Sequence, residues 1–257
     1  MKHAKHLAII GSRGMLGSDL ADYLKSKFKV TGIDRKNYNR FKERKFDIVI
    51  NANGNSNKIW AQESVLEDFQ ASTTSVYKSL FDFPCKTYIY ISSADVYPDH
   101  KNKKNTSETT EINPEELSSY GLHKYLSENI VRNIAKNYII FRCPMILGTK
   151  LRKGPIYDIL NNSRLYISPK SSFQMITTHE VANIISFLLG NNITCEIFNV
   201  GGKGTVDLSS VAKYLKKSQT FPKSAETQTY EMDISKLGKK YQLKTSIKYL
   251  QDFLKQL

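Results

Sequence analysis

Residues 8–17 read Ala-Ile-Ile-Gly-Ser-Arg-Gly-Met-Leu-Gly: a short apolar run that leads into Gly11, Gly14 and Gly17, followed by a helix-like segment over 15–26. In such a turn, Gly11 permits the tight bend, Gly14 lets backbone amides approach a diphosphate, and Gly17 lets the helix pack close to the strand. The amino-terminus of the helix then points at the anion. The spacing predicts a phosphate-binding turn, although ordinary strand-turn-helix units also show it.

A second apolar run, residues 28–33, ends at Asp34. An acid about twenty residues after a glycine turn is placed to accept hydrogen bonds from an adenosine ribose, so the two features together predict a nicotinamide dinucleotide. Asp34 favours the free ribose hydroxyls of NAD, whereas Arg13 and Arg35 are placed to meet the ribose phosphate of NADP. The sequence leaves the choice between NAD and NADP open.

Strand-like and helix-like segments alternate through the first half of the chain, which is typical of a parallel sheet flanked by helices. This pattern predicts an α/β fold with a doubly wound sheet of the Rossmann type. Too few residues separate Asp34 from Phe46 for a helix and another strand, so that edge of the sheet is expected to be trimmed. The predicted strands are 6–10, 28–33, 46–51, 87–92 and 138–142, and the predicted helices are 15–26, about 62–81 and 118–136.

The character of the chain changes after Gly148, where Lys, Arg, Pro and Gly are scattered over residues 149–175. We expect residues 1–148 to form the dinucleotide-binding domain and residues 149–257 a small substrate lobe over the carboxyl ends of the strands, where ligands bind in open α/β sheets. Part of 178–202 is expected to return to the first domain. The predicted elements of this half are a helix near 180–190, a strand at 196–200, and short helices near 207–217, 233–239 and 246–256.

The chain carries a formal net charge of +14. A basic surface attracts nucleic acid, membranes or phosphorylated small molecules. Here the lysine clusters at 101–104, 213–217 and 236–240 lack interleaved aromatic residues, which favours a solvated surface over a polyanion site. We therefore expect neither nucleic acid nor a membrane as partner, and leave a homodimer open.

Cysteine and histidine usage points to a reducing compartment without a metal site. Cys85, Cys143 and Cys195 are few and widely separated, and the five histidines form no metal-ligating constellation. No apolar stretch approaches the length of a membrane span, and the first strand begins too early to leave room for a signal peptide. The sequence predicts a cytoplasmic protein.

Tyr120 and Lys124 lie four residues apart in a predicted helix, so their side chains share one face. The pKa of a phenol is ~10 and must fall by about three units before the group can act as a base at neutral pH. One lysine charge at roughly 6 Å lowers this pKa by about two units, and an oxidised nicotinamide could supply the remaining decrease. The same spacing recurs at Tyr23/Lys27, Tyr38/Lys42, Tyr97/Lys101 and Tyr166/Lys170.

Context separates Tyr120 from these other tyrosines. The strand before its helix ends in Ser92 and Ser93, which it delivers to the ligand-binding end of the sheet. A serine there could hydrogen-bond a substrate carbonyl or hydroxyl while the tyrosine exchanges its proton. Alternatively, the two serines merely end the strand and start a turn.

These motifs, taken in order, resemble the extended short-chain dehydrogenases, also called the NAD-dependent epimerase/dehydratase family. The resemblance covers nearly the whole chain. The short stretch between Asp34 and Asp47 is similar to the dTDP-4-dehydrorhamnose reductase branch. The matching segments are 11–17, Asp34, 51–54, 92–97, 120–124, 142–148, 178–182 and 198–202.

The resemblance implies a set of site residues. Ser93, Tyr120 and Lys124 take the catalytic places, with Lys124 also holding the nicotinamide ribose. Ser93, Asp95, Met145 and Arg152 are expected near the substrate. Contacts with NAD(P) are expected from Gly11, Ser12, Arg13, Gly14, Met15, Leu16, Gly17, Asp34, Arg35, Asn51, Ala52, Asn53, Ser92, Tyr120, Lys124 and Cys143.

The chain also departs from the family pattern. Gln70 stands for the usual helical asparagine, Met145 for a substrate-contacting asparagine, and an arginine is replaced near Phe173. Arg152, Lys153, Arg164 or Lys170 could replace a lost diphosphate contact or could equally be solvated surface. Asp95 falls where 4,6-dehydratases carry an acid, but Ala94 replaces its acidic neighbour, and an exposed Asp in a loop often forms an Asx turn.

The resemblance implies an NAD(P)-dependent enzyme that acts on a nucleotide-activated sugar by hydride transfer, as a 4-ketoreductase or an epimerase, with the reductase preferred for the trimmed edge. Two alternatives remain. A dinucleotide fold repurposed to bind RNA or another polyanion is suggested by the net charge. A cofactor-binding sensor without catalysis is suggested by Gln70 and Met145.

Overall fold

The computed structural model describes residues 4–217 and 225–257 and centres on a six-stranded sheet in the order β2-β1-β3-β4-β5-β9. Neighbouring strands in this sheet all pair in parallel. The chain therefore has the predicted α/β fold with a doubly wound parallel sheet. The strands are β1 His6–Ile10, β2 Lys29–Ile33, β3 Phe46–Asn51, β4 Cys85–Ser93, β5 Tyr138–Cys143 and β9 Glu196–Asn199.

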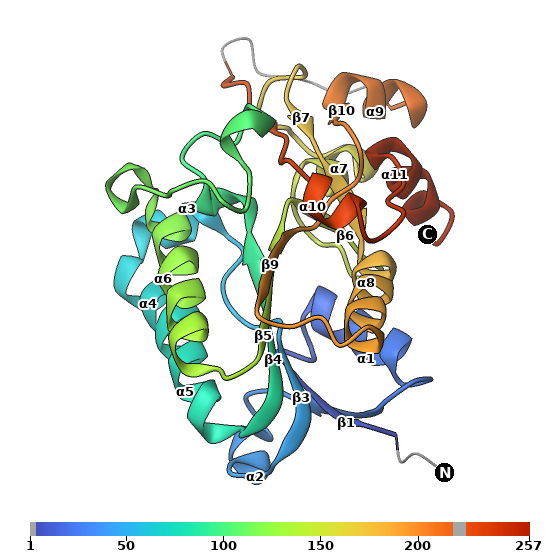
Figure 1. Ribbon diagram of the computed structural model, residues 1–257. Coiled ribbons are helices and arrows are strands. Elements are labelled where there is room, and N and C mark those ends of the chain that lie inside the picture. The colour runs from blue at the N-terminus through green and yellow to red at the C-terminus, as the bar shows by residue number, and fades with distance from the viewer. Residues whose placement is uncertain (1–3, 218–224) are drawn as a thin grey trace.

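The central strands are apolar on both faces because helices cover both sides of the sheet. Figure 1 shows α1 (Met15–Leu24) and α8 (Thr178–Gly190) on one face and α4 (Val65–Phe69), α5 (Ser75–Asp82) and α6 (Ser119–Ile134) on the other. Leu7, Ile9 and Ile50 pack into the core under α1 and α8, whereas Ala8 and Val49 point to the opposite core.

The edge beside β2 is trimmed, as predicted. Only the short helix α2, Tyr38–Phe41, lies between β2 and β3, and β2 pairs with β1 alone. The connection is instead a compact turn in which the Asn37 side chain accepts from the Asp34 amide at 2.8 Å and donates to the Gly32 carbonyl at 3.0 Å.

The helix predicted at 62–81 is interrupted. The structure has α3 (Lys58–Glu63), α4, a π-helical turn η1 (Gln70–Thr74) and α5 in this region. Ser64 separates α3 from α4, and the Ser-Thr-Thr run at 72–74 lies in the π turn. Wide turns of this kind occur frequently at functional sites, and this one faces α6.

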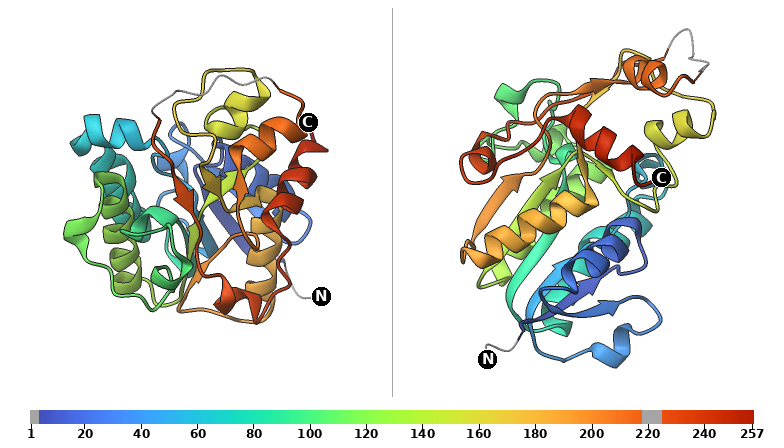
Figure 2. Two further views of the ribbon diagram at one scale, coloured as in Figure 1. Left: turned by 90° about the horizontal axis from the view of Figure 1, so that it is seen from above. Right: turned by 90° about the vertical axis from the view of Figure 1, so that its right-hand side faces the viewer.

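Most of the C-terminal part lies beyond the carboxyl ends of the strands, at the top of Figure 1 and of the right-hand view in Figure 2. It has its own core, to which Leu147, Ile159, Phe173 and Leu208 contribute. β9 returns to the main sheet beside β5, and the division into a domain at 1–148 and a lobe at 149–257 stays a prediction. The elements are β6 Met145–Leu147, α7 Pro155–Leu160, β7 Ser172–Phe173, β8 Met175–Thr177, β10 Val206–Asp207, α9 Leu208–Tyr214, β11 Thr229–Tyr230, α10 Ser235–Gly238 and α11 Ser246–Leu254.

Among residues 4–217 and 225–257, no helix combines the length and the apolar character that crossing a membrane requires.

Candidate active site

The glycine turn after β1 has the geometry that its sequence predicts. Gly11 adopts a φ of 83°, and its amide donates to the Ile33 carbonyl at 2.9 Å. A Cβ on Gly17 would lie 2.2 Å from the Gly11 oxygen, so only glycine lets α1 approach the turn. Gly14 is exposed at the start of α1 and has no side chain to cover the first amides of the helix. The turn therefore fits the diphosphate of a dinucleotide.

The loop after β3 packs against this turn. A Cβ on Gly11 would lie 2.9 Å from the Ala52 oxygen and from the Asn53 amide nitrogen. The Asn51 side chain is fully buried, donates to the Tyr88 hydroxyl at 2.8 Å and accepts from the Asn53 amide at 2.9 Å. Asn51 therefore shapes the loop and offers no exposed side-chain atom to a ligand.

Asp34 ends β2 beside the glycine turn and pairs with Arg13, whose Nε lies 2.5 Å from Oδ2. Partial burial opposes ionisation of Asp34, but the Lys36 amide and the Arg13 guanidinium together hold the pKa of the carboxyl below its usual value. Arg13 is two-thirds exposed and Arg35 is exposed. The acid that suits NAD and the cation that suits NADP thus occupy the same position.

Ser93 ends β4, and its hydroxyl donates to Asp95 Oδ2 at 2.7 Å. The other oxygen of Asp95 lies 2.7 Å from Lys58 Nζ and accepts from the Tyr230 hydroxyl at 2.9 Å. Burial alone would raise the pKa of Asp95, but the Lys58 ammonium and the hydrogen bonds from Ser93 and Tyr230 together outweigh it, and the pKa is lowered. Asp95 is therefore a largely buried, paired carboxylate rather than the exposed Asx-turn residue that the sequence also allowed.

Tyr120 and Lys124 are placed by the start of α6. The Ser118 hydroxyl accepts from the Gly121 amide at 3.2 Å and caps the helix. A Cβ on Gly121 would lie 2.2 Å from the backbone carbonyl oxygen of Asp95, so glycine lets the helix begin directly against the residues that follow β4. Lys124 Nζ donates to the Ile91 carbonyl at 3.3 Å and lies 5.2 Å above the Tyr90 ring.

Burial dominates the titration of both side chains. It raises the pKa of Tyr120 well above its usual value, the Asp95 charge adds to this, and a side-chain hydrogen bond with Ser93 opposes it. Burial also lowers the pKa of Lys124 to about 8. The sequence argument expected the lysine charge to lower the phenol pKa, but in the protein without cofactor the removal of water from the phenol and the Asp95 charge have the larger effect.

Ser92 belongs to a different network. Its hydroxyl donates to Glu128 Oε1 at 2.5 Å, and Glu128 forms a buried ion pair with Arg142 at 2.7 Å. Arg142 also donates to the Tyr97 hydroxyl at 2.8 Å. The sequence prediction placed Ser92 at the cofactor; its hydroxyl instead helps to hold α6 against β4 and β5.

The other predicted residues lie around the carboxyl end of β5. Cys143 ends that strand, and burial raises the pKa of its thiol to about 12 while Lys124 opposes the rise. Met145 begins β6 and is half-buried. The basic residues proposed for a diphosphate, Arg152, Lys153, Arg164 and Lys170, are all exposed in the segments 149–154 and 161–170.

Sequence reasoning missed Lys58, Tyr230 and Asp68. Lys58 and Tyr230 are far apart in the chain, and no short motif links them to Asp95. Gln70, read as the helical asparagine, is exposed on η1, whereas Asp68 is fully buried and pairs with His123. A buried acid two residues before the expected position is visible only once the π turn is known.

A cavity of about 340 Å³ lies in the C-terminal part, and its lining contains neither Ser93 nor Tyr120. Lys103, Lys104 and Lys203 line it together with Glu231 and Asp233. Two acids offset most of the charge of three lysines, so this cavity does not favour a polyanion. Among the described residues, no group of His, Cys, Asp and Glu is arranged to hold a metal ion.

The sheet order and the glycine turn define an α/β fold of the dinucleotide-binding type, and Ser93, Tyr120 and Lys124 form its candidate site. Residues 7–158 match the family model described as "NAD dependent epimerase/dehydratase family", and the chain belongs to this family. The family is NAD(P)-dependent and modifies nucleotide sugars. A comparison with curated protein sequences gives no match.

Solved structures with the same fold cover almost the whole chain. A dTDP-4-dehydrorhamnose reductase from Bacillus anthracis in complex with NADP has a TM-score of 0.82 at 14% identity and covers 100% of both chains. One from Clostridium acetobutylicum has 0.79 at 18%, covering 97% of this chain and 98% of that one. A UDP-glucuronic acid 4-epimerase from Bacillus cereus, with UDP-glucuronic acid and NAD, has 0.79 at 18%, covering 98% and 99%.

Proposed function

We propose that the protein is a cytoplasmic NAD(P)-dependent 4-ketoreductase of a nucleotide sugar. The observation that carries the proposal is the grouping of Ser93, Tyr120 and Lys124 beside the glycine turn. Tyr120 hydrogen-bonds with Ser93, and Lys124 lies one helical turn further along α6. A bound nicotinamide would supply the hydride, with its diphosphate at Gly11, Gly14 and Gly17 and its adenosine ribose at Asp34.

The protein's own residues handle the proton. Tyr120 gives its phenolic proton to the carbonyl oxygen of the sugar as that oxygen gains charge, and the Lys124 ammonium stabilises the phenolate that remains. With a pKa of about 8, Lys124 is charged at neutral pH. The near-complete burial of Tyr120 and Lys124 excludes water from this exchange.

We prefer reduction over epimerisation because the edge beside β2 is trimmed, as in the reductase branch that the sequence resembles. The Ser93 hydroxyl donates to the Asp95 carboxylate at 2.7 Å, and its hydrogen bond with Tyr120 lowers the phenol pKa and so favours the phenolate that forms when the proton is transferred. The raised pKa of Tyr120 keeps the phenol protonated. A protonated phenol can give its proton to a ketone substrate, and the same group serves either reaction. Asp95 is itself paired with Lys58, and we assign it no proton-abstracting role.

The substrate carries a nucleoside diphosphate in this proposal. The similar proteins with bound ligands hold UDP-glucuronic acid or UDP-glucose with NAD. In this chain, Arg152 and Lys153 are exposed on the segment after β6, and we propose that they contact the diphosphate. Met145 replaces an amide at the sugar end with an apolar thioether, which suits a deoxygenated carbon better than a hydroxyl.

A substrate panel tests the proposal. Purified protein is incubated with NADH or NADPH and with nucleotide-linked 4-keto-6-deoxy sugars, and cofactor oxidation is followed by absorbance. In parallel, NAD and UDP-hexoses are supplied, and sugar products are separated by chromatography. Cofactor oxidation that depends on a keto sugar supports a reductase. Epimerised UDP-hexose without net cofactor oxidation would identify an epimerase instead. Neither activity, with bound cofactor, would favour the non-catalytic sensor.

A homodimer is part of the proposal. The layer of α3 to α6 exposes large apolar side chains, among them Leu66 at 75% and Phe81 at 56%, and exposed apolar patches of this kind mark protein interfaces. A second copy is the partner that we expect. Light scattering after size exclusion should give a dimer, and Leu66→Asp with Phe81→Asp should give a folded monomer. A monomeric unmodified protein at micromolar concentration would refute this part.

A further inference from the structure

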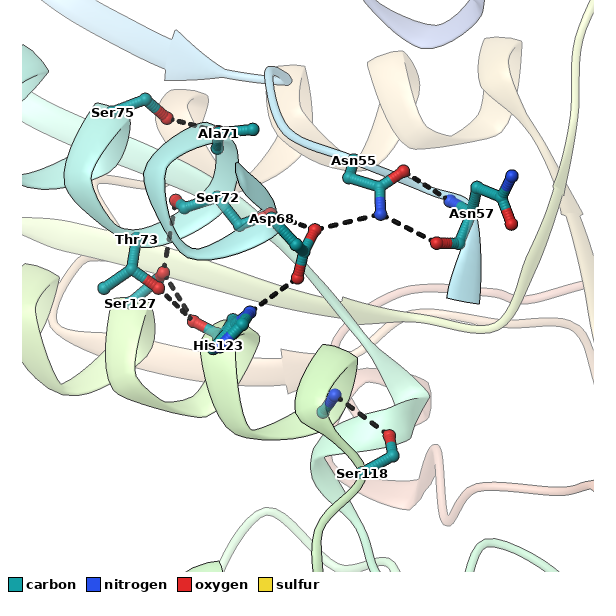
Figure 3. A network of polar contacts seen from close by, with 11 residues as sticks. Asn55, Asn57, Asp68, Ala71, Ser72, Thr73, Ser75, Ser118, His123 and Ser127 are labelled. Atoms are coloured by element: carbon teal, nitrogen blue, oxygen red, sulfur yellow. Dashed lines mark hydrogen bonds and ion pairs between the residues drawn. The ribbon is translucent and has the colours of Figure 1, made fainter. Parts of the chain in front are cut away.

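Asp68 is a carboxylate with no exposure to solvent, and three side chains donate to it (Figure 3). His123 Nδ1 lies 2.5 Å from Oδ2, and Asn55 Nδ2 and Ser72 Oγ lie 2.9 Å and 3.3 Å from Oδ1. A buried charge is tolerated only where such donors replace water. The network is therefore built around this one acid.

His123 connects Asp68 to the catalytic helix. It directly precedes Lys124 on α6, and its backbone carbonyl accepts from the Ser127 hydroxyl at 2.7 Å and from the Thr73 hydroxyl at 3.1 Å. Thr73 lies in the π turn, which thereby hydrogen-bonds to α6 as well as to Asp68 (Figure 3). Any shift of Asp68 would be passed to the part of α6 that holds Lys124.

The loop after β3 joins the same network. Asn55 Nδ2 also donates to the Asn57 carbonyl at 2.7 Å, which fixes the loop that packs on the glycine turn. Gly54, with a φ of 123°, lies beside the lysine: a Cβ built on it would be 3.5 Å from Lys124 Nζ and 3.7 Å from Ser72 Oγ. Gly54 therefore lies close to both the Lys124 ammonium and Ser72, which donates to Asp68.

Several charged and titratable groups surround Lys124 from the elements packed against it. They are Asp68 on α4, Cys143 at the end of β5, Glu128 on α6 and Asp95 after β4. Glu128 is paired with Arg142 and Asp95 with Lys58, which offsets their charges. Burial lowers the pKa of Lys124, and among these four groups Asp68 opposes that decrease most strongly.

We propose that Asp68, held by His123, is a positioning residue and a buried counter-charge that holds the Lys124 ammonium beside the loop after β3. Gln70, the residue that the sequence aligned with the family's helical asparagine, is exposed and does not enter this network. The inference rests on the proposed function only for the statement that Lys124 takes part in catalysis.

The test measures the titration of Lys124 directly. The protein without cofactor is trace-labelled with acetic anhydride at a series of pH values, and acetylation of Lys124 is quantified by mass spectrometry. The midpoint in the unmodified protein should lie near a pKa of about 8. Asp68→Asn should lower the midpoint by about one unit or more, because a buried negative charge has been removed.

Glu67→Gln is the matched control, since it removes the same charge from the neighbouring, exposed position on α4. Its midpoint should equal that of the unmodified protein. A folded Asp68→Asn protein whose Lys124 midpoint is unchanged would overturn the inference, and so would an equal shift in Glu67→Gln.

A second pair of variants decides the matter if Asp68→Asn does not fold. His123→Asn keeps an amide donor where Nδ1 lies, whereas His123→Leu leaves Asp68 with a poorly compensated charge. In the leucine variant the poorly compensated buried carboxylate takes up a proton and loses its negative charge, so we expect the Lys124 midpoint to fall, and we expect the asparagine variant to restore it. Identical midpoints in the two variants would also overturn the inference.

The readouts separate this inference from the proposed function. Labelling needs neither cofactor nor substrate, so absence of NAD(P)H binding or turnover in the unmodified protein would count against the proposed function alone. Where NAD(P)H does bind, its dissociation constant should increase at pH values above the Lys124 midpoint. This increase should begin at a lower pH in Asp68→Asn than in the unmodified protein. If the dissociation constant increased at the same pH in both proteins, Asp68 would not set the charge of Lys124.

Discussion

The guanidinium of Arg13 lies 2.5 Å from the carboxylate of Asp34, so a cation and an anion share the position expected for the adenosine ribose. A free carboxylate there accepts hydrogen bonds from ribose hydroxyls and repels a ribose phosphate. Arg13 is largely exposed and can leave the pair to contact a phosphate. We therefore expect the balance between these two side chains to influence the preference between NADH and NADPH.

Substitution of either partner should therefore shift cofactor preference in opposite directions. Asp34→Asn should raise the affinity for NADPH relative to NADH by roughly tenfold, about 1.4 kcal/mol, because the repulsive charge is gone. Arg13→Ala should lower the same ratio. Fluorescence titration with each cofactor measures both. Parallel changes for NADH and NADPH in the two variants would show that this pair does not discriminate.

Tyr120→Phe should reduce kcat by about 10³-fold or more while it leaves NAD(P)H affinity nearly unchanged, because the variant loses only the transferable proton. Tyr125→Phe, on the same helix and packed against the C-terminal core, is the control and should keep full activity. Steady-state rates and cofactor titration supply the two readouts. Turnover that survives in Tyr120→Phe would remove this residue from the mechanism.

Lys124 should destabilise the protein at neutral pH. Its pKa is about 8 in the folded protein and 10.5 in the absence of burial, a difference of about 2.5 pH units or roughly 3 kcal/mol. The unfolded chain holds this proton more tightly, so the cost is fully present below pH 8 and disappears as the pH rises toward 10.5. Lys124→Met should therefore unfold at higher temperature at pH 7 and lose that advantage near pH 10.5.

Calorimetry or circular dichroism across this pH range checks the sign. Lys78→Met, which removes an exposed lysine from α5, should leave the melting temperature almost unchanged at every pH. A Lys124→Met protein that is less stable at pH 7 would mean that the lysine stem and its bond to the Ile91 carbonyl contribute more than charge burial costs.

The buried pair of Arg142 and Glu128 should respond strongly to the loss of one partner. Arg142→Met leaves the Glu128 carboxylate buried without its cation, which should cost about 3–5 kcal/mol in urea unfolding. Adding Glu128→Leu to this variant should recover much of the loss. Lys248→Met, which breaks an exposed pair with Asp252, should cost about 1 kcal/mol or less. Similar losses in both single variants would contradict the burial argument.

Local patterns in the sequence were enough to predict the main sheet. β1 and β3 lie at the predicted residues 6–10 and 46–51, because apolar runs between two helical layers leave little choice. The short strands β6, β7, β8, β10 and β11 escaped prediction, since two or three residues carry no periodicity and pair only through long-range contacts. The break of the helix predicted at 62–81 escaped for a related reason: packing against α6 favours the π turn.

The candidate site shows the same division. The grouping of Ser93, Tyr120 and Lys124 could be predicted because each follows from its place at the end of a strand or on a helix. The ion pair of Asp95 with Lys58 could not be predicted, since it joins residues whose spacing carries no signal. The contact of His123 with Asp68 could not be predicted either, since it joins residues 55 positions apart.

Lys58 donates to the Tyr230 hydroxyl at 2.6 Å across 172 positions of sequence, and both side chains meet at Asp95. An early and a late segment of the chain are thus fastened to one carboxylate beside Ser93. Heating or denaturant should melt both halves in one step, and a fragment that ends before residue 196 should fail to fold because it also lacks the sixth strand. Substitutions in the late segment that break this contact should consequently lower the stability of the whole protein as well as change its specificity.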